Sequence, residues 1–142
     1  QTCALPICLH GLMETAEERK MTVERIAIRN YEDATNTILN SLLTMDPAPT
    51  ALYCESDELA LPVIYKLCQY GHAVPQELSV IGFDDVPLAA KIGLTTLHQD
   101  PFNMGENAAR KMLSVMSGKT PKPLHETLQA QLMMRETTAF ID

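Results

Sequence analysis

Polar side chains follow four apolar, strand-like runs of this sequence, and their types could bind a small polar molecule. The candidates are Asn30, Tyr31, Glu55, Ser56, Asp57, Asp84, Asp85, His98, Gln99 and Asp100. Carboxylate, amide and hydroxyl groups exchange hydrogen bonds with hydroxyls, and bonds to a charged group contribute roughly 1.5–3 kcal/mol each. We therefore expect a lining suited to a polar, neutral ligand such as a sugar.

Local structural roles compete with ligand binding at these positions. Ser56 is a residue type favoured at a helix N-cap, and an acid such as Asp57 is favoured in the first helical turn. Asp84 and Asp85 precede a short helical turn that they could cap. The sequence leaves both alternatives open, so ligand binding by these residues is a hypothesis.

Enzyme chemistry has little support in this sequence. The six glycines are dispersed, so they form no phosphate-binding loop, and no G-x-S-x-G nucleophile motif is present. Asp84 and Asp85 are adjacent, and adjacent side chains at a strand end point apart, which makes them a weak acid–base pair. His98 and Asp100 should diverge for the same reason. We expect no enzymatic activity and no cofactor.

The chain has four cysteines, Cys3, Cys8, Cys54 and Cys68. Cys54 ends an apolar run and Cys68 falls on the apolar side of a predicted helix. We therefore expect both to be buried, reduced thiols rather than parts of a disulfide framework. Cys3, Cys8 and His10 lack a matching second pair of ligands, so no metal site is expected.

Helix-like and strand-like stretches alternate along the chain. The spacing of apolar residues predicts helices over 9–20, 32–45, 56–70, 86–92 and 102–117, and strands over 23–29, 50–54, 78–83, 94–99 and 126–135. Strands separated by helices are typical of a doubly wound α/β fold with a parallel sheet. Ligands bind beyond the carboxyl ends of such strands, where the candidate polar residues lie.

Residues 1–7, QTCALPI, fit neither a helical nor an alternating pattern. They match the in-frame translation of a common sequencing-adapter end, so we interpret them as a scar that carries no information on the fold. A genuine irregular N-terminal segment is the alternative.

Composition limits the class of protein. The chain has 142 residues, 46% of them apolar, and a net charge of −7, as expected for a soluble globular protein. No apolar run approaches the ~20 residues of a membrane-spanning helix, and we expect no membrane association. Residues 51–100 carry seven acids against two lysines, so this stretch should repel a phosphate backbone.

Three segments carry motifs whose combination is specific. Residues 49–85 contain S-D-E-L-A and G-F-D-D, residues 94–113 contain L-T-T-L-H-Q-D-P-F-N-M-G, and residues 133–138 contain R-E-T-T. Together they resemble the effector-binding domain of LacI/GalR-family bacterial transcriptional regulators, over about residues 8–140. The resemblance implies the type I periplasmic-binding-protein-like fold, in which two subdomains close on a small molecule.

The same resemblance implies which side chains contact the effector. The positions carried over are Asp84, Ser56, Asp57, Gln99, Asn30 and Tyr31. Asp84 and Ser56 occupy positions that bind effector hydroxyls in the family, and Gln99 lies where the chain crosses between subdomains. Asn30 stands where many members have an aromatic residue that stacks on a sugar, and Tyr31 is the candidate substitute.

The resemblance also implies that the domain is incomplete at its N-terminal side. We expect residues 8–99 to form the C-terminal subdomain, 100–124 a helix of the missing N-terminal subdomain, and 125–142 a return strand and tail. A stripe formed by Met104, Met112 and Met116 should then be exposed. We expect the isolated chain to be poorly stable or to aggregate.

The implied function is that of a cytoplasmic regulator that senses a sugar or related metabolite. DNA would be bound only through the missing N-terminal domain, and the full-length protein would be a homodimer. A sugar-binding protein of an ABC transporter, which has the same fold, is the alternative.

Overall fold

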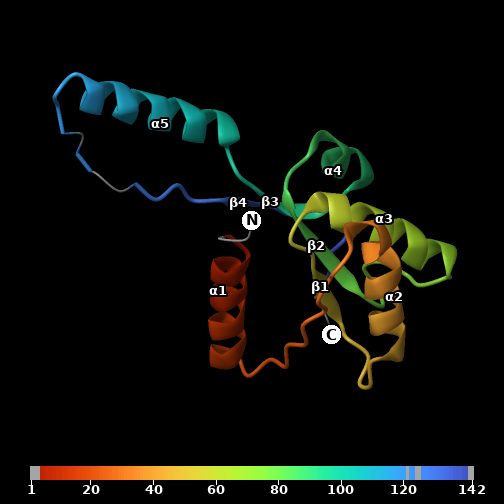
Figure 1. Cartoon of the computed structure of the whole chain (residues 1–142). Coiled ribbons are helices and arrows are strands. Elements are labelled where there is room, and N and C mark those ends of the chain that lie inside the picture. Colours follow the sequence, from red (N-terminus) through yellow and green to blue (C-terminus); the bar gives the residue numbers. More distant parts are fainter. Residues whose placement is uncertain (1–3, 121, 124–125, 141–142) are drawn as a thin grey trace.

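A four-stranded sheet lies at the centre of the structure (Figure 1). The computed structural model describes residues 4–120, 122–123 and 126–140. The strands are β1 (Ala51–Tyr53), β2 (Ser79–Asp84), β3 (Thr95–His98) and β4 (Gln131–Met133), in the order β1-β2-β3-β4. The first three are parallel, as predicted, whereas β4 is antiparallel to β3, so the sheet is mixed.

The helices alternate with these strands and confirm the predicted α/β class. They are α1 (Ala4–Glu18), α2 (Ala34–Thr44), α3 (Asp57–Gln69), α4 (Pro87–Ile92) and α5 (Pro101–Met116), and a single 3-10 turn, η1 (Tyr31–Asp33), precedes α2. Both α4 and α5 begin with a proline, which suits the first helical position because its N–H would lack a partner there in any case.

The core lies between the sheet and the helices α2 and α3, which are neighbours in Figure 1. Side chains alternate along β2, where Val80 is fully buried while Ile81 and Phe83 on the opposite face are half-buried. Leu39 of α2 and Val63 of α3 are buried in the same cluster as Val80. This packing fixes the position of the strand ends that carry the candidate polar residues.

The strand predicted over residues 23–29 is absent. Residues 21–28 have no regular secondary structure, and residues 22–29 form no backbone-to-backbone hydrogen bond within the described part of the chain. Ile26 and Ile28 still pack against the core. The apolar alternation therefore predicted correctly which side chains face inward, but a strand also needs a hydrogen-bonded neighbour, and this segment has none among the described residues.

The last predicted strand is shorter than expected. The alternation predicted residues 126–135, but β4 covers only Gln131–Met133, and residues 124–125 lie outside the described part of the chain. After β4 the backbone leaves the ladder, because the Glu136 N–H donates to the Gly93 carbonyl oxygen at 2.8 Å. The R-E-T-T motif thus packs beside the sheet instead of extending a strand.

Helix α1 begins inside the segment that the sequence analysis set aside. Ala4–Ile7 are helical, which corrects the expectation of no helical pattern there. Pro6 falls in the first turn, where a missing N–H breaks no helical hydrogen bond. Residues 1–3, which include Cys3, lie outside the described residues.

The two cysteines of the central region differ in exposure. Cys54 is buried and free, as predicted. Cys68 is exposed, so the prediction of a second buried thiol was wrong. Its place near the end of α3, after the buried Leu67, puts it on the outer side of the helix.

Helix α5 projects away from the sheet (Figure 1) and has no buried residue. Met104, Met112 and Met116 are 44%, 63% and 76% exposed, which confirms the expected exposure of this stripe. In the part of the chain that the structure describes, no helix combines the length and apolar character needed to cross a membrane.

Candidate functional site

The carboxyl ends of the parallel strands bring most of the candidate residues to one edge of the sheet. Asp84 ends β2 and pairs in register with His98, which ends β3 and precedes Gln99. Ser56 follows β1 and caps α3. The expectation that these positions gather at one edge agrees with the strand register.

Asp84 presents an exposed carboxylate at this edge. Its Oδ1 accepts a long hydrogen bond, 3.4 Å, from Gln99 Nε2. Partial burial raises the pKa of Asp84, the negative charge of Asp57 adds to this, and the Gln99 bond opposes it. A carboxylate with little internal compensation is a strong acceptor for the hydroxyls of a ligand.

Asp84 and the following residue adopt an uncommon backbone conformation. Asp84 has φ +110° and Asp85 has φ +57°, both in the region that L-residues other than glycine rarely occupy. Such residues cost about 1–3 kcal/mol each and persist only where surrounding contacts determine them. The turn after β2 is therefore held by its neighbours.

Asp85 turns inward and forms an ion pair with Arg135 of the R-E-T-T motif. Arg135 Nη2 donates to Asp85 Oδ1 at 2.6 Å, and the two side chains are only 17% and 14% exposed. Arg135 Nη1 also donates to the Leu94 carbonyl oxygen at 2.8 Å. His98 Nδ1 lies 3.1 Å from Asp85 Oδ2, but the geometry is not that of a hydrogen bond, so it adds attraction only when the ring is protonated.

Asp57 is fully buried and its carboxylate faces the protein interior. Thr96 Oγ1 donates to Asp57 Oδ1 at 2.6 Å, and the Val86 N–H donates to Asp57 Oδ2 at 2.9 Å. A Cβ at Gly82 would lie 2.1 Å from Oδ1, so the carboxylate fits because residue 82 has no side chain. The structure does not support a direct contact of Asp57 with a ligand, because both oxygens are buried and already accept bonds.

Ser56 and Asn30 both act as local caps. Ser56 Oγ accepts from the Leu59 N–H at 3.3 Å, which confirms its predicted N-cap role in α3. Asn30 Oδ1 accepts from the Glu32 N–H at 3.1 Å and caps η1. Ligand contacts by these two side chains remain a prediction.

Tyr31 links η1 to the end of β1. Its hydroxyl donates to Glu55 Oε1 at 2.5 Å, and the residue is 63% exposed. This bond, followed by partial burial and the charge of Glu55, raises the pKa of Tyr31 to about 12. Glu55 belongs to the strand-end positions predicted from the sequence, and its carboxylate is the partner of the Tyr31 hydroxyl.

Thr137 closes the sheet beside β2, and sequence reasoning assigned it no role. Its Oγ1 donates to the Val80 carbonyl oxygen at 2.7 Å and accepts from the Thr95 N–H at 2.9 Å. The Val80 N–H in turn donates to the Thr137 carbonyl oxygen at 2.7 Å. The R-E-T-T motif itself was the available signal, because it places one cationic and two hydroxyl side chains next to the last strand.

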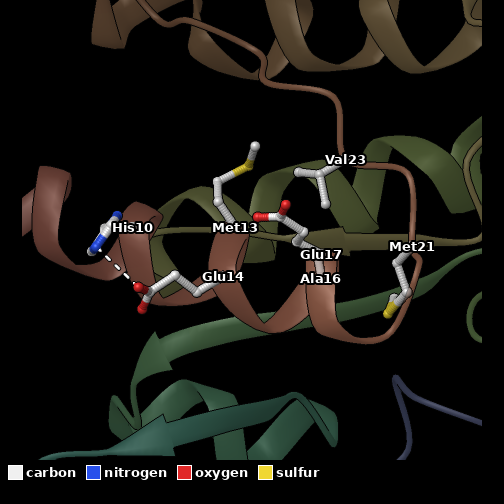
Figure 2. A pocket seen from close by; sticks show the side chains of 7 residues that line it. All are labelled: His10, Met13, Glu14, Ala16, Glu17, Met21 and Val23. Carbon is white, nitrogen blue, oxygen red and sulfur yellow. Dashed lines mark ion pairs between the residues drawn. The ribbon is translucent and has the colours of Figure 1, made fainter.

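A shallow depression of about 410 Å³ lies elsewhere, between α1 and the segment that follows it. Figure 2 shows its lining, which is His10, Met13, Glu14, Ala16, Glu17, Met21 and Val23. None of the strand-end residues contributes to it. His10 and Glu14 form an exposed i,i+4 pair at 3.3 Å, and among the described residues no three ligating side chains are placed to hold a metal ion.

Comparisons with known proteins relate most of this chain to one family. Residues 7–138 match the family model of the periplasmic binding protein-like domain. The chain is 31% identical, over 91% of its length, to the HTH-type transcriptional repressor PurR of Vibrio cholerae, of which it covers 40%.

Solved structures give the same picture of the fold. A LacI-family regulatory protein from Chloroflexus aggregans superposes with a TM-score of 0.80 at 22% identity, over 92% of this chain and 49% of that one. The transcriptional regulator CelR in complex with cellobiose superposes with a TM-score of 0.77 at 26% identity, over 91% of this chain and 41% of that one. The chain thus spans less than half the length of each of these proteins.

Proposed function

Because this chain belongs to the periplasmic binding protein-like family, in its LacI/GalR-type branch, we propose that it is part of the effector-binding domain of a bacterial transcriptional regulator. The observation that carries the proposal is the exposed carboxylate of Asp84, held on a constrained turn at the carboxyl end of β2. Ligands of open α/β sheets bind at such strand ends.

The effector in this proposal is a neutral, hydroxyl-rich molecule such as a sugar. Asp84 accepts hydrogen bonds from its hydroxyls, and Gln99, 3.4 Å away, supplies both a donor and an acceptor. Ser56, Asn30 and Tyr31 complete the polar lining, whereas Asp57 is buried beneath this lining and does not contact the ligand. The cellobiose complex of CelR supports a saccharide because CelR has a related fold.

Residues 8–99 and the tail over 125–142 form one half of the binding domain in this proposal, and residues 100–124 belong to a second half outside this chain. Helix α5, which has no buried residue, supports that division. Closure of the two halves on the effector favours one of two states of the regulator, and such coupling is typically about 1–3 kcal/mol. DNA is bound through a segment outside this chain, by a cytoplasmic homodimer.

The relatives reported above favour a regulator over the transport protein considered as the alternative. PurR is named as a transcriptional repressor, and CelR and the Chloroflexus protein as transcriptional or regulatory proteins, rather than as enzymes or importer components.

Asp84→Ala in a full-length regulator that carries this chain tests the proposal. Calorimetric titration with glucose, sucrose and cellobiose, and with nucleobases as hydroxyl-free probes, identifies the ligand class. Loss of one bond to a charged acceptor, roughly 1.5–3 kcal/mol, should weaken saccharide binding by about 10- to 100-fold and leave operator binding intact. Asp46→Ala, at an exposed loop residue, is the matched control. Unchanged affinity and induction in Asp84→Ala would refute the assignment.

A further inference from the structure

Three consecutive residues of the turn after β2 are each held by a different partner. The Asp84 carboxylate accepts from Gln99, the Asp85 carboxylate from Arg135, and the Val86 N–H donates to Asp57. The partners lie on separate segments, since Gln99 follows β3, Arg135 follows β4 and Asp57 opens α3, so the turn is fixed from several directions.

We propose that Arg135 is a positioning residue for ligand binding, acting through Asp85 to aim the carboxylate of Asp84 at the strand-end surface. The inference rests on the proposed function, because it takes Asp84 as the group that binds the ligand. Arg135 is the arginine of the R-E-T-T motif.

The backbone explains why Asp84 needs such help. Positive φ angles at two successive aspartates are not maintained by local preference, since L-residues favour other conformations. Asp85 is drawn inward to 14% side-chain exposure, whereas Asp84 is exposed. Because adjacent side chains diverge, the inward pull on Asp85 directs Asp84 outward.

Arg135 is suited to this task because it is itself fixed to the start of β3. Its Nη1 donates to the Leu94 carbonyl oxygen at 2.8 Å and its backbone N–H donates to Thr95 Oγ1 at 2.9 Å. A guanidinium can make such bonds in fixed directions while it pairs with a carboxylate. The ion pair therefore ties the turn to β3, one of the strands that form the binding edge.

A second arginine–carboxylate pair provides the matched control. Arg110 Nη2 donates to Glu106 Oε1, also at 2.6 Å, but within α5 and with side chains 72% and 42% exposed. Substitution of Arg110 removes a pair of equal length and charge that is unconnected to the turn.

Saccharide affinity in a double-mutant cycle tests whether Arg135 acts through Asp84. The binding assay uses cellobiose, sucrose and glucose with the full-length regulator and the variants Arg135→Gln, Arg135→Lys, Asp84→Ala and Arg110→Gln. We expect Arg135→Gln to weaken binding at least 10-fold, Arg135→Lys to recover most of this because it keeps the charge beside Asp85, and Arg110→Gln to change it less than twofold.

The cycle separates failure of this inference from failure of the proposed function. Arg135→Gln should have less than a twofold effect when Asp84→Ala is already present, because its action passes through Asp84. An equal loss in both backgrounds would overturn the positioning role while leaving Asp84 as the binding group. An Asp84→Ala variant with normal affinity would instead refute the proposed function.

Hydrogen exchange of the turn gives a readout that needs no ligand. Exchange of a peptide over residues 83–90 should accelerate at least 10-fold in Arg135→Gln, remain close to the parent rate in Arg135→Lys, and stay unchanged in Arg110→Gln. Unchanged exchange in Arg135→Gln would overturn the inference even if none of the three saccharides bound.

Discussion

Replacement of Asp57 by alanine removes a fully buried carboxylate that joins three elements of the fold. Asp57 opens α3, its Oδ1 accepts from Thr96 on β3, and its Oδ2 accepts from the Val86 N–H ahead of α4. Alanine accepts neither bond, so the Thr96 hydroxyl and the Val86 amide are left without an internal partner. Buried polar groups without a partner are a recognised source of large destabilisation.

The magnitude follows from these two bonds. Each hydrogen bond to a charged group contributes roughly 1.5–3 kcal/mol, so we expect Asp57→Ala to lower the free energy of unfolding by about 3–6 kcal/mol. Domains are typically stable by only about 5–15 kcal/mol, so the loss is a large share of the total. Urea unfolding followed by far-ultraviolet circular dichroism, on variants of one full-length parent, measures it.

Two further variants make the test specific. Glu58→Ala removes the next acid of the same helix turn, which is exposed, and should cost less than about 1 kcal/mol through the helix dipole. Gly82→Ala would place a Cβ 2.1 Å from Asp57 Oδ1, so it should destabilise the parent but cost less in the Asp57→Ala background. Equal costs for Asp57→Ala and Glu58→Ala would refute the role of Asp57 as an internal brace.

Three other predictions follow from exposure and charge. The pKa of Asp84 is raised in the fold, so the ionised carboxylate lowers the stability of the folded state at neutral pH. Asp84→Asn should therefore be more stable than the parent at pH 7, as measured by thermal unfolding. The difference in stability should vanish as the pH falls below 3.8, the ordinary pKa of an aspartate. Burial raises the pKa of Cys54 to about 12, so iodoacetamide at pH 8 should alkylate exposed Cys68 at least 10-fold faster, and equal rates in mapped peptides would contradict the burial. The isolated chain should associate through α5, so Met112→Glu with Met116→Glu should raise the monomer fraction in size-exclusion chromatography with light scattering; an unchanged fraction would show that this stripe does not drive association.

The sequence by itself determined the class of fold and the positions of the polar residues along it. The spacing of apolar residues and the helix-capping residues predicted the bounds of α2, α3, β2 and β3 to within a few residues, because these signals are local in the sequence. The end of each predicted strand also located Asp84 and Gln99 at one edge, since parallel strands share a direction.

Tertiary structure decided what each polar side chain faces. Asp57 and Asp84 were both candidates for ligand contact in the sequence, yet Asp57 is fully buried and Asp84 is exposed. Arg135 reaches Asp85 from 50 positions away, and Thr137 pairs with Val80 from 57 positions away. No local pattern encodes contacts of that separation, because they depend on which segments the sheet places side by side. The same reason explains the absent strand over 23–29, where an alternating pattern found no hydrogen-bonded neighbour among the described residues.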